Sequence, residues 1–319
     1  MAGNGVSDMR EVELYRLEGI YRDDLVVKGF TFGKGDKAAC VVGPLRGNEI
    51  QQLYICSQLV KALKELEAND CITSGKQIMV VPVVNHYSMN IGRRFFGVSN
   101  TDINRCFPGN DYSDTSNRIA DGLFKNIQDY TYGIHLASFY MTGEFVPHVR
   151  MMETGFQNTS LANLFGLPYV VVRKPTPIDT KTLNYNWQDD MTAAFSLYTN
   201  KNDTIDENSA TQAVAAILRF LTRMGIIHYE SHSGYISHVI QEEDLTQISA
   251  MAAGIFRGRV APGEDVRYST PLAEIIDPYT GAVKETILAP TDGIVFFAHT
   301  TPLIDEGEIA YRLIHRLHA

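Results

Sequence analysis

KAACVVGPLRGNEIQQLYICSQLVKALKELEA, residues 37–68, joins a short apolar run to a longer segment with helical periodicity. The run at 37–43 is apolar and contains two consecutive valines, which is typical of a buried strand. From residue 48 onward apolar side chains recur at three- and four-residue steps, as on one face of a helix. A second apolar run, QIMVVPVV, follows at 77–84. Strand, helix and strand in this order predict a βαβ unit with parallel strands.

Alternation of helical and strand patterns continues to about residue 229. We expect two strands, at 168–173 and 194–199, and three helices, at 116–127, 161–165 and 206–224. Asp206 can cap the last helix, and Gly225 is placed to end it in a left-handed conformation. Residues 173–190 are polar and contain proline, so they predict a long lid or recognition loop, with Trp187 as an anchor or interface residue.

The composition changes after about residue 229. Short alternating runs punctuated by Gly and Pro replace the helical patterns, at 254–260, 272–276, 286–289, 294–298 and 309–314. We therefore predict an α/β domain over residues 10–229 and a small all-β domain over residues 230–319.

Charge and hydropathy narrow the classes of function. The chain has 319 residues and a net charge of −9, and an acidic chain is a poor binder of nucleic acid backbones. The first ten residues lack the apolar core of a secretory signal, and no uncharged apolar stretch approaches the roughly 20 residues needed to cross a bilayer. These features predict a cytoplasmic protein without membrane contact. A second copy of the chain remains open as a partner.

Three motifs fall near the ends of predicted strands. Arg46-Gly47-Asn48-Glu49 lies where the first strand meets its helix. NTDINRCFPG occupies residues 100–109, and its composition is unusually specific for a loop. A strand-like segment, 132–135, ends in His135 and is followed by Pro147-His148-Val149-Arg150. The carboxyl ends of strands are where α/β proteins assemble their sites, so these motifs are candidates for one site.

The order of these motifs resembles the succinylglutamate desuccinylase and aspartoacylase family, which belongs with the zinc carboxypeptidases. The resemblance runs roughly from residue 37 to 314, and APTDG at 289–293 is similar to the lipoyl-like domain that these proteins append. It implies a zinc-carboxypeptidase-like α/β domain, with a central mixed sheet and helices on both faces, and a lipoyl-like or barrel-sandwich β domain. It also implies a zinc-dependent hydrolase that releases the acyl group of an N-acyl amino acid or a similar small anion.

The resemblance assigns roles to several positions. In the family a His-x-x-Glu pair and a later His hold zinc, and the open fourth position activates a water molecule. Glu49 matches the glutamate ligand and His135 the later histidine. Asn104 and Arg105 match the substrate-binding pair. The anionic substrate is expected to contact these two residues together with Arg94, His148 and Arg150.

Three positions depart from the family pattern. Arg46 stands at the first histidine, Tyr198 at the general-base glutamate, and Gly133 at the aspartate that precedes the later histidine by two residues. Arginine stays protonated and offers no lone pair to a metal, so Arg46 is more naturally an ion-pair partner of Glu49. We hypothesise that its guanidinium occupies the space, and part of the charge role, of the zinc ion. Arg46 and Tyr198 are then the candidate catalytic groups.

Alternative readings accompany these assignments. His86, after the second strand, could supply the missing ligand beside Glu49 and His135, and His148 is another candidate for zinc binding. In the plainer readings Glu49 only favours a helix N-terminus, the arginines are solvated, and Tyr198 is packing. A metal cluster of three histidines near the domain junction also stays open, at His228, His232 and His238. A non-catalytic descendant that binds a small anion or a partner protein is the alternative function.

Overall fold

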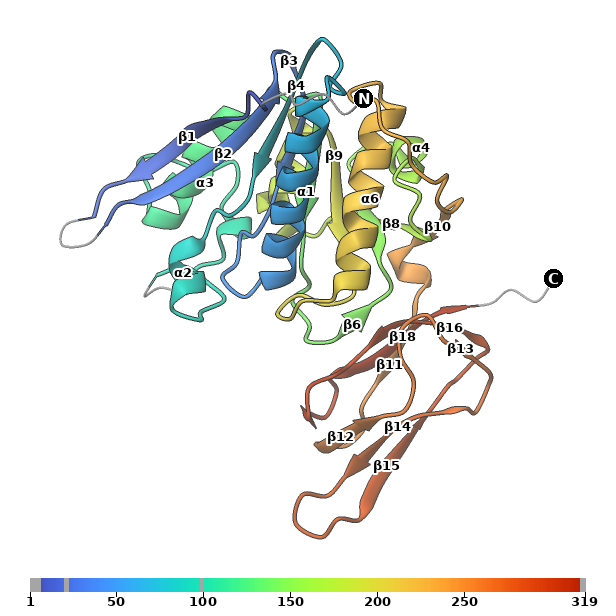
Figure 1. Cartoon of the computed structure of the whole chain (residues 1–319). Helices are drawn as coiled ribbons and strands as arrows, with labels where there is room; N and C mark the ends of the chain where they lie inside the picture. The colour runs from blue at the N-terminus through green and yellow to red at the C-terminus, as the bar shows by residue number, and fades with distance from the viewer. Residues whose placement is uncertain (1–6, 20–22, 98–99, 316–319) are drawn as a thin grey trace. The chain divides into compact units, whose positions relative to one another are not determined.

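The computed structural model describes residues 7–19, 23–97 and 100–315, which form two compact units (Figure 1). The first unit contains the described residues up to Ser138, then 148–198 and 202–239. The second unit contains 139–147, 199–201 and the residues from Ile240 on. The boundary expected at residue 230 therefore lies inside the first unit, and two short internal segments belong to the second.

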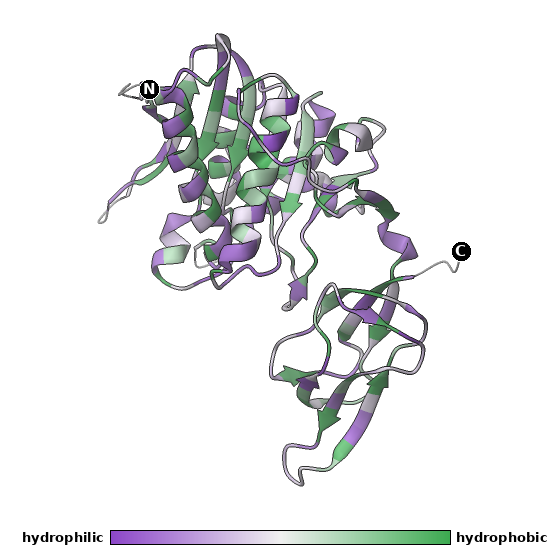
Figure 2. Ribbon diagram, turned by 45° about the vertical axis from the view of Figure 1, so that its right-hand side comes forward, coloured by the Kyte–Doolittle hydropathy of each residue, from purple (hydrophilic) through white to green (hydrophobic). Residues whose placement is uncertain are grey.

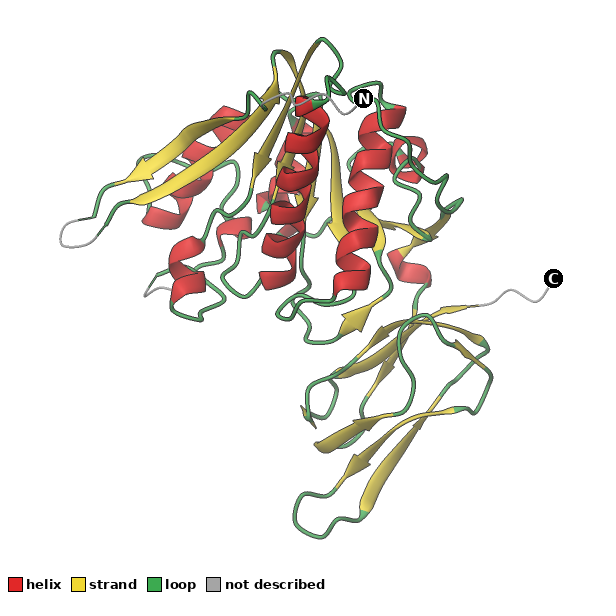
Figure 3. Ribbon diagram, viewed as in Figure 1, coloured by secondary structure: helices red, strands yellow, loops and turns green. Residues whose placement is uncertain are grey.

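The described part of the first unit is built on a nine-stranded mixed sheet in the order β1-β2-β4-β3-β5-β9-β7-β8-β10 (Figure 3). Strands β4, β3, β5 and β9 are parallel neighbours, whereas β7 is antiparallel to β9. The bounds are β1 (Arg10–Leu17), β2 (Leu25–Gly33), β3 (Gly35–Val42), β4 (Gly75–Val81), β5 (Tyr132–Leu136), β7 (His148–Met152), β8 (Tyr169–Arg173), β9 (Ala193–Tyr198) and β10 (His238–Gln241).

Helices cover both faces of this sheet, as predicted. The larger helices on one face are α1 (Ile50–Ala68) and α6 (Glu207–Arg223), with the short α4 (Thr159–Asn163) beside them. On the other face lie α3 (Thr115–Ile127) and α5 (Leu183–Asp189). Figure 2 shows the strands between these layers as mostly hydrophobic. Continuous apolar strands such as β3 and β4 thus have a packed face on each side.

The βαβ prediction is confirmed, because β3 and β4 pair in parallel on either side of α1 in the sequence. The ends of α6 are also as predicted. The Asp206 side chain accepts a hydrogen bond from the Asn208 backbone N–H at 3.2 Å, and Gly225 has a φ of +66°. Asp206 bonds a backbone N–H that has no partner within the helix, and Gly225 adopts the left-handed conformation that ends the helix.

The prediction of a loop over residues 173–190 is wrong. The segment holds a 3₁₀ turn, η2 (Asp179–Lys181), and helix α5. The Thr182 side chain caps α5, and Leu183 and Trp187, one turn apart, are fully buried. The rest of the helix is polar, so its two apolar positions gave too little periodicity to be recognised. The hairpin of β1 and β2 also had no predicted element.

The second unit is all β apart from the 3₁₀ turn η3 (Glu242–Asp244), as predicted. Its described strands form two sheets around a separate core, in the orders β11-β18-β16-β13, with β6 also beside β16, and β15-β14-β12-β17. The bounds are β6 (Glu144–Phe145), β11 (Thr246–Ser249), β12 (Gly254–Gly258), β13 (Asp265–Val266), β14 (Pro271–Ile276), β15 (Val283–Leu288), β16 (Gly293–Ala298), β17 (Leu303–Ile304) and β18 (Ile309–His315). Within residues 7–19, 23–97 and 100–315, no helix has the length and apolarity needed to span a bilayer.

Candidate functional site

One face of the nine-stranded sheet carries two rows of polar side chains across adjacent strands. In the first row, His135 on β5 is in register with Ser196 on β9, which is in register with Arg150 on β7. In the second row, Tyr198 on β9 pairs with His148 on β7, and their rings stack with centroids 5.0 Å apart. In-register residues point to the same face of a sheet, so these side chains share one floor.

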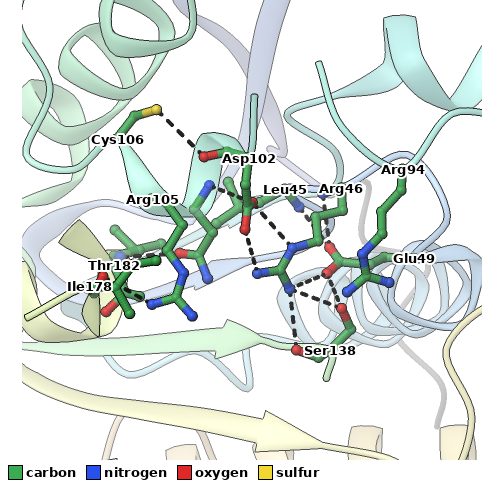
Figure 4. Close-up of polar contacts among 12 residues, drawn as sticks. Leu45, Arg46, Glu49, Arg94, Asp102, Arg105, Cys106, Ser138, Ile178 and Thr182 are labelled. Atoms are coloured by element: carbon green, nitrogen blue, oxygen red, sulfur yellow. Dashed lines mark hydrogen bonds and ion pairs between the residues drawn. The ribbon is translucent and has the colours of Figure 1, made fainter. Parts of the chain in front are cut away.

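Arg46 lies at the centre of a buried ionic cluster just beyond the carboxyl end of β3 (Figure 4). Its Nε and Nη2 donate to the two carboxylate oxygens of Asp102 at 3.1 and 2.9 Å. Its Nη1 lies 3.2 Å from Glu49 Oε1 and donates to the Ser138 carbonyl oxygen at 3.2 Å and to Ser138 Oγ at 3.1 Å. The predicted ion pair between Arg46 and Glu49 is therefore confirmed.

Glu49 is fully buried and its carboxylate is saturated with donors. Oε2 accepts the backbone N–H groups of Leu45 and Arg46 at 2.9 and 3.0 Å. Oε1 accepts the Ser138 hydroxyl and an N–H of the Arg46 guanidinium. A carboxylate has about four acceptor positions, so Glu49 has little capacity left for another donor. Glu49 precedes α1 but makes no side-chain cap bond to it. Its carboxylate instead bonds Arg46 and Ser138, so the reading in which Glu49 only favours a helix N-terminus is wrong.

His135 is 1% exposed, and no described residue bonds its Nε2. Burial, with a smaller contribution from the positive charge of Arg46, lowers the pKa of His135 to about 3. The imidazole is therefore neutral near pH 7. Gly133 stands two residues before His135, where the family has an aspartate. A Cβ at this position would lie 2.7 Å from the Trp187 ring, so Trp187 occupies the space in which the aspartate side chain would begin.

Asn104 and Arg105 are held by the segment around α5. Asn104 Oδ1 accepts the Leu183 backbone N–H at 3.1 Å. Arg105 Nη1 donates to the Ile178 carbonyl oxygen at 3.0 Å and to Asp179 Oδ1 at 2.9 Å. Burial opposes ionisation of Asp179, but hydrogen bonds from Thr176 and Arg105 prevail and lower the pKa of its carboxyl group. The Arg105 guanidinium is thus oriented by the protein before any ligand binds.

The other arginines of the predicted site adjoin the same region. Arg94 Nη1 donates at 3.3 Å to Oδ1 of Asn48, the residue before Glu49. The Arg150 guanidinium lies 5.0 Å from the centre of the Tyr198 ring, and Arg150 is only 7% exposed. A buried guanidinium over an aromatic face is a packed group, so the reading of Arg150 as solvated charge is wrong.

Zinc does not fit the residues present. Among the described residues no group of three or more His, Cys, Asp and Glu side chains is arranged to hold a metal ion. His86 is not brought to Glu49 and His135; it lines a separate pocket with Asp24, Tyr87 and Phe96. The absence of any such metal-binding group among the described residues also contradicts the metal site considered at His228, His232 and His238. The position of the first ligand is filled by a guanidinium that has no lone pair to donate.

Several residues of the site were not found from the sequence. Asp102 stands inside the quoted NTDINRCFPG motif, two residues before Asn104, but had no assigned role. Ser138 has no motif around it, and Ser196 is an ordinary strand residue. Asn184, on α5, is 3% exposed, and neither end of its amide bonds a described residue. A buried amide with both ends open is a candidate ligand contact.

Comparison with known proteins agrees with this architecture. The succinylglutamate desuccinylase/aspartoacylase catalytic domain profile matches residues 36–224, more than half of the chain. No curated protein sequence matches the chain. A crystal structure of a succinylglutamate desuccinylase from Silicibacter sp. TM1040 superposes with a TM-score of 0.81 at 17% identity, covering 96% of this chain and 94% of that one.

Two further structures are similar over nearly their whole length. The product-bound ectoine utilization protein from Ruegeria pomeroyi has a TM-score of 0.79 at 18% identity and covers 96% of this chain and 94% of its own. An aspartoacylase family protein from Mesorhizobium loti has a TM-score of 0.78 at 19% identity, with coverages of 99% and 96%. At these identities the structures show the fold, and the matched catalytic-domain profile shows the family. The chain belongs to the succinylglutamate desuccinylase/aspartoacylase family.

Proposed function

We propose that this chain acts on a small anionic N-acyl amino acid, or a similar N-acylated anion, as a deacylase-type protein that works without zinc. The observation that carries the proposal is the assembly of Arg46, Glu49, Asp102 and His135 at the carboxyl ends of β3 and β5. Family membership supports amide hydrolysis as the reaction. The ionic cluster supports a site in which the guanidinium of Arg46 supplies the positive charge that zinc supplies in the family.

The arginines support an anionic ligand. Arg105 is fixed by Asp179 and the Ile178 carbonyl through one terminal nitrogen, and its side chain is 17% exposed. A guanidinium oriented in this way suits a carboxylate, which it can bind through two parallel hydrogen bonds. The similar protein from Silicibacter is described as a succinylglutamate desuccinylase, and succinylglutamate is an N-acyl amino acid that carries carboxylates.

In such a reaction each residue has a physical role. In the hydrolysis, water bonds to the acyl carbon through its oxygen, the C–N bond breaks, and the water's proton goes to the leaving amine. Negative charge develops on the carbonyl oxygen during the attack, and donors fixed in advance, here the Arg46 guanidinium, stabilise it. Glu49, Asp102 and Ser138 hold that guanidinium in place. The Tyr198 hydroxyl is the group at the position of the family's glutamate, where it can give its proton to the leaving amine and regain one from the attacking water.

The test is to incubate the purified chain with N-succinylglutamate and N-acetylaspartate and to follow the free amino acids by mass spectrometry. Turnover should persist in EDTA. The methyl esters of the same compounds, which lack the carboxylates, should react poorly. Equal turnover of acids and esters, or turnover abolished by EDTA and restored by zinc, would contradict the proposal.

Binding without hydrolysis is the second candidate, and two observations favour it. All acceptor positions of Glu49 are occupied, and Tyr198 stands where a carboxylate base is expected. Calorimetry with the same compounds separates the two candidates. Saturable binding of the acids with no release of amino acid would assign a binding function, whereas neither binding nor turnover would reject the ligand class itself.

A further inference from the structure

We infer that the Arg46 guanidinium is the resident cation of this site, that it excludes a divalent metal, and that the single change Arg46→His opens the site to zinc. The inference concerns metal content alone and does not depend on whether the chain hydrolyses its ligand. It follows from where the guanidinium lies, from the charges around it, and from the donors that would remain if it were removed.

Position is the first step. The Arg46 side chain is 2% exposed and contacts Glu49, Asp102 and Ser138 at 2.9 to 3.2 Å. These contacts use all three nitrogens of the guanidinium. A metal ion bound by Glu49 would have to displace one of the four donors that now bond its two carboxylate oxygens.

Charge is the second step. Glu49 and Asp102 are two buried carboxylates with side chains 0% and 9% exposed, and both contact Arg46. A guanidinium is not deprotonated in proteins, so it cannot make way for a metal by losing its charge. A dication beside it would meet like charge in a region with little water to screen the repulsion.

The remaining donors are the third step. His135 is in register with Val42, four residues before Arg46, and Ser138, three residues after His135, bonds both Arg46 and Glu49. No described residue bonds the buried Nε2 of His135. With histidine at position 46, Glu49, His135 and the new imidazole would supply two nitrogens and one carboxylate, a donor set that zinc binds in enzymes. Removal of the guanidinium would also take away a positive charge that both carboxylates now contact.

The experiment measures zinc by mass spectrometry after dialysis against zinc chloride and buffer. The wild type and Arg46→Lys, which keeps a positive charge, should retain almost no zinc. Arg46→His should retain about one zinc ion per chain, and the ion should raise its unfolding temperature. Arg46→His combined with Glu49→Gln should lose the ion. Arg118→His, the same change at an exposed ion pair with Asp111, controls for an added surface histidine.

Two results would overturn the inference. One is about one zinc ion in the wild type that Glu49→Gln removes. The other is a folded Arg46→His variant, judged by circular dichroism, that retains no more zinc than Arg118→His. If Arg46→His does not fold, the wild type and Arg46→Lys still decide the exclusion: zinc-free folded protein in both supports it, and stoichiometric zinc in either rejects it.

Discussion

At the scale of single residues, Arg46 contacts the carboxylates of Glu49 and Asp102 at 3.2 and 2.9 Å and contributes the positive charge between them. Arg46→Met would remove the guanidinium that contacts both carboxylates, of which that of Glu49 is fully buried. Breaking a buried ion pair from one side typically costs about 3–5 kcal/mol, so we expect a loss of that order in the free energy of unfolding by urea. Restoring neutrality with Glu49→Gln in the Arg46→Met background should recover part of the loss. A change below about 1 kcal/mol would instead indicate a solvated, weakly coupled arginine.

Arg105 is the residue on which the anionic ligand class depends most directly. Arg105→Ala removes the oriented guanidinium and should weaken a carboxylate ligand by about 1.5–3 kcal/mol, as measured by calorimetry. Arg105→Lys keeps the charge but cannot make two parallel hydrogen bonds to a carboxylate. The affinity of this variant should therefore fall between those of the wild type and Arg105→Ala. Wild-type affinity in Arg105→Ala would show that the carboxylate binds elsewhere.

Asp179 links pH to the stability of the same region. Its pKa is lowered in the folded chain, so its carboxylate contributes stability above the unfolded value of about 3.9, and that contribution is lost as the pH falls through the lower folded value. The wild type should therefore be more stable than Asp179→Asn near pH 6, and the difference should shrink below about pH 4. Urea unfolding at several pH values measures it. A difference that grows toward acid pH would contradict the assignment.

Which of these residues could be predicted depends on how local their contacts are. Arg46 and Glu49 are three residues apart just before α1, so their ion pair could be predicted from their spacing and from the chemistry of arginine. Asp102 and Ser138 meet the same guanidinium from 56 and 92 residues away. Only the completed sheet brings them together, and no local pattern marks Ser138.

At the scale of elements, α5 shows a helix that tertiary packing specifies. It has seven residues, too few to be stable alone, and the Trp187 ring lies against Gly133 of β5. Gly133→Ala should overpack this contact at a cost of about 1–3 kcal/mol, and Trp187→Ala should cost about 3–5 kcal/mol by leaving a cavity. The double variant should be more stable than the sum of the two losses implies, because the added methyl group then meets no ring. Strict additivity in urea unfolding would show that the two positions do not touch.

At the scale of the whole molecule, the order of helices and strands was predictable because long amphipathic helices and apolar strands carry strong periodicity. The division of the chain into two units was harder to predict from the sequence. Segments 139–147 and 199–201 lie within the α/β part of the sequence but belong to the second unit. The first segment pairs with a strand more than a hundred residues later in the chain, through Phe145 and Phe297, and the second contacts the first through Asn200 and Lys201. A change in composition along the chain cannot reveal such a contact.

This arrangement predicts how the chain tolerates truncation. Strand β6 pairs with β16, and the fully buried Phe145 packs on Phe139, Phe296 and Phe297 within the second unit. A chain ending at Val239 keeps Phe139 and Phe145 but loses their partners, so it should expose both rings and a strand edge and should aggregate. Size-exclusion chromatography tests this, with Phe139→Ser and Phe145→Ser in the truncated chain as the matched control that should restore a monomer. A truncated chain that is already monomeric and has the wild-type unfolding temperature would contradict this prediction. It would show that the first unit folds without β16 and that the exposed rings of Phe139 and Phe145 do not cause aggregation.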